Sequence, residues 1–343
     1  MLGSLYSAVN GLKTHQQKMD VVGNNISNVS TYGYKASRMT FRDSFYETLQ
    51  AASRTGATVG GTNPRQLGHG AIAGSIDVLH SRSGFAPTGF ALDAAIMGNG
   101  YFMVGQPVDT GIYSTPRPGE PNKIQGLNLT RVGTFGIDGE GNLVDSNGNY
   151  VYGYHISNKD ASKGKVMNIQ NYYTNTTDIT EVAPNPDPGH NDALKMYRIR
   201  IPKEKVTVNG TQVYKNMDLS GISIGRDGVI TGIKTSQPDA NGNVTNEIVY
   251  IGQIALASVT NPSALQMTQN TYFKAKENVG EIMANKPGEG STGDLMSGGL
   301  EMSNVDLAQQ FTEMITTQRG FQANTKMITV SDEMLAELVN MKR

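Results

Sequence analysis

Apolar residues recur every three or four positions through residues 1–30 of the chain. Side chains at this spacing lie on one face of a helix and form a coiled-coil-like stripe. The pattern therefore predicts an amphipathic helix at the N-terminus. The stripe consists of Leu2, Leu5, Val9, Leu12, Gln16, Met19, Gly23 and Ile26, of which only Gln16 and Gly23 are not apolar.

The sequence that follows this stripe, NNISNVSTYGYK, contains residues that end helices. Asn25 and Asn28 can hydrogen-bond to their own backbone and so compete with the hydrogen bonds of a helix. Gly33 is free to adopt turn conformations that other residues avoid. We therefore expect the helix to end near Asn28, and we expect these three residues to shape the exit from it.

The C-terminal segment repeats the pattern. Ser303 or Asn304 is a suitable N-cap, and Asp306 lies in the expected first turn, where a negative charge is favourable. The pattern predicts a second amphipathic helix that continues to the last residue. Its stripe consists of Leu307, Met314, Phe321, Ile328 and Leu335, which are spaced by seven residues.

Two such helices at opposite ends of one chain suggest a pair that lies side by side. A single terminal helix of this kind more often docks on its own domain. A pair of helices, however, has little core, and isolated helices are only marginally stable in water. The remaining apolar residues need partners from the middle of the chain or from other copies. The pair favours a self-assembling protein whose ends become ordered on polymerisation, because binding stabilises the bound form by mass action.

The middle of the chain has the pattern of a β protein. Segment 41–57 is expected to hold a short helix, and the sequence after it reads as extended chain and turns. Apolar and polar residues alternate from about residue 76 onwards. The sequence LDAAIMGNGYFMVG predicts a β-hairpin that turns at Asn99-Gly100. Further turns are expected at Asp138-Gly139, Gly141-Asn142 and Asn147-Gly148.

These elements predict an α+β fold, in which the N- and C-terminal helices form a coiled-coil-like inner domain and nested, mainly antiparallel β domains lie between them. Near residues 155–218 the composition shifts to Asn, Asp, Thr and Pro, which reads as an insertion. Strands expected after it would rejoin the earlier β domain. The predicted divisions are an inner helical domain (1–30 plus 303–343), a connecting region (31–75 plus 286–302), a β domain (76–154 plus 219–285) and an inserted outer β domain (155–218).

Composition narrows the possible functions. The 343 residues include no cysteine, which excludes disulfides, thiolate chemistry and cysteine zinc sites. The formal net charge of −1 provides no basic field for nucleic acid or for an anionic membrane. No stretch is apolar enough to span a bilayer, and the N-terminus lacks the apolar run of a signal peptide. We expect no nucleic-acid binding, no membrane insertion, and no cleaved signal if the protein is exported.

No motif makes a case for an enzyme. Gly68, Gly70 and Gly74 superficially match a dinucleotide-binding loop, but the strand–turn–helix context is missing. The sequence DGEGNLVDSNGN has oxygen-bearing residues at alternate positions, as calcium loops do, but it lacks the required glycine and the closing glutamate. The five histidines are not at metal-ligand spacing. We expect no catalytic, cofactor-binding or metal-binding residues.

Several long segments resemble, in order, the axial proteins of the bacterial flagellum, which form the rod and hook family. NNISNVSTYGYK resembles the family's signature after the N-terminal helix. The next family segments are matched by NPRQLGHGAIAGSI, ALDAAIMGNGYFMV and LTRVGTFGIDGEGNLVDSNGNYVYGY. The sequence from LEMSNVDL to the last residue resembles the family's C-terminal segment. The resemblance covers nearly the whole chain except about 155–218.

Within the family, the resemblance favours a hook subunit, because the chain has a sizeable insertion and because SNVDL and QRGFQANTKMI look more like hook sequence. This implies a structural protein that polymerises into a curved tube between rod and filament, a universal joint that transmits torque for motility. It implies an extracellular location, reached through the flagellar type III export apparatus with an uncleaved signal. The implied partners are further copies of the chain, the distal rod protein, the hook cap protein and the hook–filament junction protein.

The expected assembly interface combines the apolar stripes of the two helices. Leu5, Leu12, Met19 and Ile26 should pack against Leu307, Met314, Phe321, Ile328 and Leu335 of the same or neighbouring copies. Two alternatives stay open. One is a distal rod subunit, which would form straight, rigid tubes. The other is a secreted β-rich adhesin, which would bind sugar as a monomer and would not need both ends of the chain.

Overall fold

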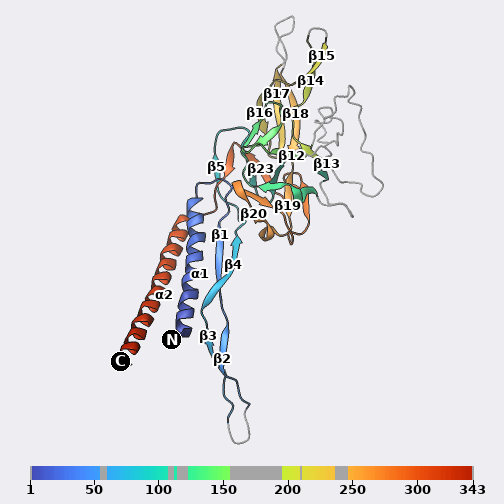
Figure 1. Ribbon diagram of the computed structural model, residues 1–343. Coiled ribbons are helices and arrows are strands. Elements are labelled where there is room, and N and C mark those ends of the chain that lie inside the picture. Colours follow the sequence, from blue (N-terminus) through green and yellow to red (C-terminus); the bar gives the residue numbers. More distant parts are fainter. Residues whose placement is uncertain are drawn as a thin grey trace. The chain divides into compact units, whose positions relative to one another are not determined.

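The computed structural model describes residues 2–54, 60–106, 112–113, 123–154, 195–208, 211–235 and 246–341 (Figure 1). The chain divides into two compact units. Unit 1 contains Met1–Thr31, Lys35–Ser81 and Ser303–Arg343, and unit 2 contains Tyr32–Tyr34 and Arg82–Met302. Most of the predicted insertion, residues 155–194, lies outside the described residues.

Unit 1 combines helices and strands. Its elements are α1 (Leu2–Ser27), β1 (Ser37–Asp43), β2 (Tyr46–Gln50), β3 (Arg65–Gly68), β4 (Ala71–Val78) and α2 (Leu307–Met341). Both predicted terminal helices are therefore present, and α1 ends close to the expected position.

Unit 2 is built mainly from short strands, with 3-10 helices at Lys123–Gly126, Pro262–Ala264 and Gln269–Thr271. Its strands in the first half are β5 (Phe85–Pro87), β6 (Ala94–Met97), β7 (Tyr101–Gly105), β8 (Ile112–Tyr113), β9 (Asn128–Thr130), β10 (Phe135–Ile137), β11 (Leu143–Asp145) and β12 (Tyr150–Tyr154). Those in the second half are β13 (Lys195–Arg198), β14 (Lys203–Val208), β15 (Thr211–Asn216), β16 (Leu219–Ile224), β17 (Val229–Thr235), β18 (Asn246–Ile254), β19 (Leu256–Val259), β20 (Gln266–Met267), β21 (Tyr272–Lys274), β22 (Ile282–Asn285), β23 (Asp294–Ser297) and β24 (Gly299–Glu301).

In unit 1, α1 lies between α2 and the antiparallel ribbon of β1 and β4 (Figure 1). The ribbon is tied to α1 by Thr14, whose Oγ1 donates a hydrogen bond to the carbonyl oxygen of Ala71 over 3.0 Å. Gly70 permits this close approach, because a Cβ at that position would lie 3.0 Å from the carbonyl oxygen of Ser7. The sequence of α1 thus provides two packing faces, one for the ribbon and one for α2.

The short helix predicted within 41–57 is wrong. Tyr46–Gln50 forms strand β2, which pairs antiparallel with β3, so that Tyr46 lies opposite Gly68. The partner strand is the next one along the chain and lies outside the segment from which the helix was predicted. Pairing with it overrides a weak local preference for helix.

The N-cap of α2 is Asp306. The sequence had suggested Ser303 or Asn304, and that prediction is wrong. Oδ1 of Asp306 accepts hydrogen bonds from two backbone N–H groups in the first turn of the helix, over 2.9 and 3.2 Å. The amide of Asn304 is engaged elsewhere, because its Nδ2 donates to the carbonyl oxygen of Leu79 over 2.8 Å. A carboxylate at this position also complements the positive end of the helix dipole.

The core of unit 2 is an antiparallel sheet in which β7 lies between β12 and β9. Phe102 and Val104 of β7 have no exposed surface, and the ring of Phe102 meets that of Phe135 edge-on at 5.0 Å. The core also includes Ile96, Val151, Ile254, Leu256 and Leu295. The prediction of an α+β fold, with mainly antiparallel β structure between two terminal helices, is confirmed.

The hairpin predicted around Asn99-Gly100 is wrong, although both of its strands exist. β6 pairs with β23, whereas β7 pairs with β12 and β9. Gly98, between the two strands, has a φ of 146°, and a Cβ there would lie 2.8 Å from the Cα of Gly293. Only glycine tolerates both this conformation and this approach. The chain therefore passes from one sheet to another at this point and does not fold back on itself.

The turns predicted after β10 and β11 are present. Asp138 Oδ1 accepts hydrogen bonds from the backbone N–H groups of Glu140 and Asn142, over 2.9 and 2.7 Å. Asp145 makes the same pattern in the next turn, where its Oδ1 accepts from the N–H of Asn149 over 2.9 Å. These carboxylates stabilise backbone turns of the Asx type. Farther along the chain, β18 pairs with β12, so the later strands return to the sheet formed by the earlier ones.

Candidate assembly surface on the terminal helices

The two terminal helices pack against each other in antiparallel register. Near the C-terminal end of α1, Asn25 Nδ2 donates to Gln310 Oε1 over 3.0 Å. Toward the N-terminal end of α1, Gly11 faces Asn324, and a Cβ at Gly11 would lie 2.8 Å from the Nδ2 atom of Asn324. Later residues of α1 therefore lie opposite earlier residues of α2, and these two contacts define the register of the pair.

Small and polar residues make the contact between α1 and α2. On α2, the buried residues are Gln310, Thr317 and Ser331. The α1 residues at matching spacing of three and four, which share one face of that helix, are Ala8, Gly11, His15, Lys18, Val22 and Asn25. We call this contact the polar seam.

His15 lies at the centre of the polar seam. Its ring meets the ring of Phe41 in β1 edge-on at 5.5 Å, and its Nδ1 atom is buried without a hydrogen-bond partner among the described residues. Burial, followed by the positive charge of Lys18, lowers the pKa of His15 from its ordinary value of 6.5. Lys18 in turn lies 3.5 Å from the carboxylate of Glu313 on α2. The seam therefore contains an imidazole whose neutral form is favoured, beside a partly buried ion pair.

Asn25 connects three elements at the end of α1. Its side chain is 1% exposed. Besides its bond to Gln310, its Nδ2 donates to the carbonyl oxygen of Ser37 over 2.8 Å, and its Oδ1 accepts from the N–H of Ser37 over 2.9 Å. Asn28 instead bonds back to the helix, since its Nδ2 donates to the carbonyl oxygen of Asn24 over 2.9 Å.

Gly33 is held in unit 2 by its backbone. Its φ is +67°, and its N–H donates to the carbonyl oxygen of Glu301 over 2.8 Å. A Cβ at Gly33 would lie 2.7 Å from a methyl group of Val132. The side chain of Glu301 is buried and lies 3.3 Å from the guanidinium of Arg131, which is also buried. The turn after α1 is thus anchored on a rigid, charge-paired part of the β structure.

The predicted apolar residues lie beside the polar seam. In each helix a stripe residue directly follows a seam residue, as Met19 follows Lys18 on α1 and Met314 follows Glu313 on α2. A step of one residue turns a helix by roughly 100° in the same sense in both helices. Because the two helices are antiparallel, these equal turns bring both stripes to the same side of the pair.

We call this side of the pair the apolar flank. In the single chain all of its residues keep part of their surface exposed to solvent. They are Leu5, Leu12, Met19, Ile26, Met314, Phe321 and Ile328. Leu307 and Leu335, the first and last residues of the α2 stripe, are 40% and 37% exposed. The structure thus brings the predicted interface residues together, and their apolar surface is incompletely covered by the rest of the chain.

Sequence reasoning missed the polar seam. The signal was present, because Ala8, Gly11, His15, Lys18 and Val22 follow the same three-and-four spacing as the apolar stripe. Small residues at this spacing allow two helix backbones to approach closely. A search for apolar positions alone does not detect them.

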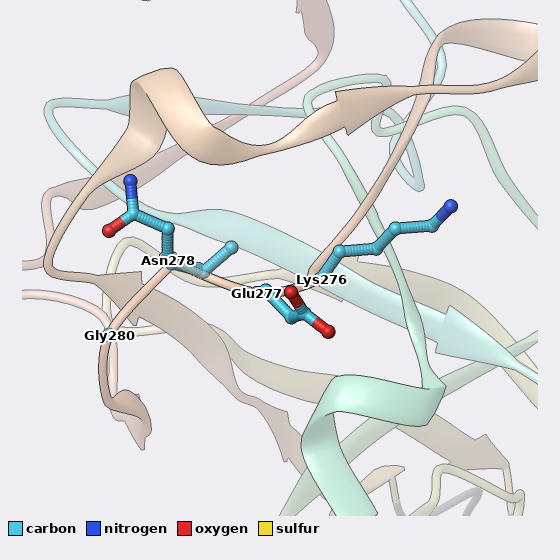
Figure 2. A pocket seen from close by; sticks show the side chains of 5 residues that line it. Lys276, Glu277, Asn278 and Gly280 are labelled. Atoms are coloured by element: carbon cyan, nitrogen blue, oxygen red, sulfur yellow. The ribbon is translucent and has the colours of Figure 1, made fainter.

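A hollow in unit 2 does not form a competing site. A surface hollow of about 740 Å³ is lined by Lys276, Glu277, Asn278, Val279 and Gly280. Figure 2 shows that the side chains of Lys276 and Asn278 point away from each other, so these polar groups do not converge on a bound molecule. Within the described ranges, no three His, Asp or Glu side chains are grouped as metal ligands. Neither α1 nor α2, as described, is apolar enough along its length to span a membrane.

Comparison with known proteins matches both segments that carry the candidate surface. Residues 5–35 match the family model described as flagella basal body rod protein, and residues 296–341 match the model described as flagellar basal body rod FlgEFG protein C-terminal. The first match covers most of α1 and the turn after it, and the second covers β24 and all of α2.

Full-length relatives are also found among characterised proteins. The flagellar basal-body rod protein FlgG of Bacillus subtilis is 39% identical over 344 aligned positions, which cover 100% of both chains. The flagellar hook protein FlgE of Borreliella burgdorferi is 29% identical over 464 positions, and that of Treponema pallidum is 27% identical over 475 positions, again with 100% of both chains covered.

Proposed function

Because the chain belongs to the family of flagellar rod and hook proteins, we propose that it is a structural subunit of the flagellar hook. In this role it self-assembles into a curved helical tube that joins rod to filament and transmits motor torque. The observation that carries the proposal is the apolar flank, whose residues from both ends of the chain lie on one side of the helix pair and remain partly exposed. Other copies of the chain are the partners that would cover it.

The two units suggest a division of labour within the tube. The helix pair of unit 1 packs in coiled-coil fashion with pairs from neighbouring copies and forms the inner layer. The β structure lies farther out in nested layers, where more polar contacts allow neighbouring copies to slide as the tube bends. Burial of the apolar flank stabilises the assembled form by roughly 25 cal/mol for each Å² of apolar surface removed from water.

The proposed partners and location follow from the same role. The tube contacts the distal rod protein at one end and the hook–filament junction protein at the other, and it grows under a hook cap protein. The flagellar type III export apparatus delivers the subunit to the cell exterior without a cleaved signal. A chain with weakly self-sufficient terminal helices suits export in an unfolded form.

A rod subunit is the second candidate. It is favoured by the 39% identity to a protein named as a rod component. The alignments with the two hook proteins extend over 464 and 475 positions, so those proteins contain long segments that this chain of 343 residues lacks. The hook is favoured by the hook-like sequence of α2. The inserted segment between β12 and β16 does not separate the two candidates, because the rod protein of Bacillus subtilis aligns with this chain over 344 positions and 100% of both chains. Electron microscopy of assembled protein separates them, since curved tubes support a hook subunit and straight, rigid tubes support a rod subunit.

The assembly itself is tested by charge substitutions on the apolar flank. Leu12→Asp and Ile328→Asp should yield folded monomers that form no tubes, because assembly would bury an unpaired carboxylate. Gln17→Asp is the matched control, because Gln17 is exposed on α1 and lies off the flank. It should assemble normally. Normal tubes from Leu12→Asp or Ile328→Asp, or monomers from the unchanged chain at high concentration in ammonium sulfate, would overturn the proposal.

A further inference from the structure

The apolar stripe of α2 is partly covered in its middle and open at both ends. Met314, Phe321 and Ile328 are partly buried in the single chain. Leu307 and Leu335 occupy the same position of the repeat, yet both are exposed. The stripe therefore ends, in each direction, in apolar surface that the chain itself does not cover.

Each open end of the stripe belongs to a larger exposed patch. At the start of α2, the base patch consists of Leu307, Phe311 and Ile315, which lie on one face because they are four residues apart. At the end of α2, the tip patch consists of Met334, Leu335, Leu338, Val339 and Met341. Exposure reaches 57% at Ile315 in the base patch and 77% at Met341 in the tip patch. Contiguous exposed apolar residues of this kind mark interaction surfaces.

The tip patch projects beyond α1. Since Gly11 faces Asn324, the stretch from Gly11 back to Leu2 spans the same length as the stretch from Asn324 to Glu333. α2 then continues to Met341, about two turns farther. Figure 1 shows the same relation, with the C-terminal end of α2 extending past the N-terminal end of α1. A short helical extension that exposes an apolar face is unstable in water without a partner.

We infer that the tip patch of one copy binds the base patch of the next copy, an inference that rests on the proposed function. The two patches lie roughly 40 Å apart on one helix, so they cannot meet within a chain. Pairing of tip with tip would close a dimer and leave both base patches exposed. Pairing of tip with base covers both patches in every copy, and such a head-to-tail contact generates an open helical polymer. It also continues the apolar stripe from Leu335 of one copy to Leu307 of the next.

A mixing experiment tests this arrangement. One variant loses the tip patch (Leu338→Lys/Val339→Lys), and another loses the base patch (Phe311→Lys/Ile315→Lys). Lysine is a good helix former, and all four positions are exposed, so both variants should keep α2. Circular dichroism checks this. The same charge on both patches also prevents a new attraction between the altered surfaces. Gln17→Lys, on the exposed side of α1, is the control and should assemble like the unchanged chain.

Each patch variant alone should fail to form tubes in ammonium sulfate and should sediment as a monomer. A mixture of the two should form a complex of one copy each and grow no further, because one intact tip meets one intact base. If the unchanged chain forms tubes but the mixture stays monomeric, or if either variant dimerises alone, the tip-to-base contact is wrong while the proposed function stands. If the unchanged chain forms no tubes, the proposed function fails with it.

The cysteine-free sequence permits a second, independent readout in assembled tubes. Ala336→Cys places a thiol beside the tip patch, and Ala308→Cys places one beside the base patch. Both substitutions are small and lie on exposed positions. After mild oxidation, a chain with both cysteines should give a ladder of covalent oligomers, and a chain with either one alone should give none. Dimers from Ala336→Cys alone would indicate tip-to-tip pairing and overturn the inference.

Discussion

Gly320 on α2 lies directly against the imidazole of His15 on α1. A Cβ at Gly320 would be 2.6 Å from the Cε1 atom of His15. The ring has little room to move away, because it meets the ring of Phe41 edge-on at 5.5 Å. The missing side chain at Gly320 is therefore what allows the two helices to approach each other here. Glycine has a low helix propensity, but at position 320 it allows this close packing.

We predict that Gly320→Ala destabilises the monomer by about 1–3 kcal/mol, as overpacking of a close contact does. Helix propensity alone would give the opposite sign, since alanine stabilises a helix interior by about 0.5–1 kcal/mol relative to glycine. The free energy of unfolding in urea, followed by circular dichroism, measures the effect. The control is Gly23→Ala, where no atom lies within 4 Å of the added Cβ. It should stabilise, and equal effects at both positions would contradict the overlap with His15.

The lowered pKa of His15 makes the stability of unit 1 depend on pH. Burial, followed by the charge of Lys18, lowers the pKa of His15 in the folded chain below its unfolded value of 6.5. Between the two pKa values the unfolded chain binds more protons, so stability rises with pH in that range. We predict that His15 contributes fully above about pH 6.5 and that its contribution is progressively lost on acidification. The unfolding free energy is measured over roughly one pH unit on either side of this ordinary pKa. On acidification it should fall less steeply in His15→Gln than in the unchanged chain, and an unchanged slope would refute the assignment.

The sequence was sufficient to predict the two terminal helices and the antiparallel strands between them. The apolar residues that recur every three or four positions form the stripe of each helix, so the helices could be predicted from this spacing alone. The hairpin at Asn99-Gly100 and the helix within 41–57 were wrong for a common reason. Both were judged from local sequence, whereas β6 pairs with β23 far along the chain and β2 pairs with the following strand, β3. Nothing in the local pattern indicates that Gly98 must fit beside Gly293.

The candidate surface was predictable only in part. The apolar residues at seven-residue spacing identified the two stripes, and the structure brings these stripes to one side of the helix pair. The polar seam was not predicted, because the contacts of Gly11, His15 and Gly320 can be recognised only when the two helices are placed side by side. The role of Asn25 likewise depends on β1 and α2, which approach it from distant parts of the sequence.

Asn25 offers a test of how α1 is fixed in unit 1. We predict that Asn25→Ala destabilises the monomer by about 2 kcal/mol or more, because it leaves polar groups of Ser37 and Gln310 buried without their partner. Asn24→Ala is the matched control, since Asn24 is exposed and its side-chain oxygen accepts a hydrogen bond from the neighbouring Asn28 on the helix surface. Urea unfolding of both variants measures the difference. A loss at Asn25 no larger than that at Asn24 would contradict the role assigned to the buried amide.

Alanine substitutions at Gly33 and Gly148, both in unit 2, distinguish the cost of backbone strain from the cost of steric overlap. Both have positive φ, +67° and +79°, so alanine is strained at either position. No atom lies within 4 Å of a Cβ at Gly148, whereas a Cβ at Gly33 would lie 2.7 Å from Val132. We predict that Gly148→Ala costs about 1 kcal/mol, the strain of a left-handed residue. Gly33→Ala should cost at least about 2 kcal/mol, because overlap adds to the strain.

Thermal unfolding followed by near-ultraviolet circular dichroism of the tyrosines measures both variants. The double variant Gly33→Ala/Val132→Ala makes the comparison sharper, because removal of the valine methyl groups relieves their part of the overlap. The stability that Gly33→Ala costs in the Val132→Ala background should then be close to the stability that Gly148→Ala costs in the unchanged chain. If Gly33→Ala costs no more than Gly148→Ala, then the turn after α1 can shift away from Val132. The N–H of Gly33 would then not be held firmly against the carbonyl of Glu301, and the rigid anchor assigned to this turn would be wrong.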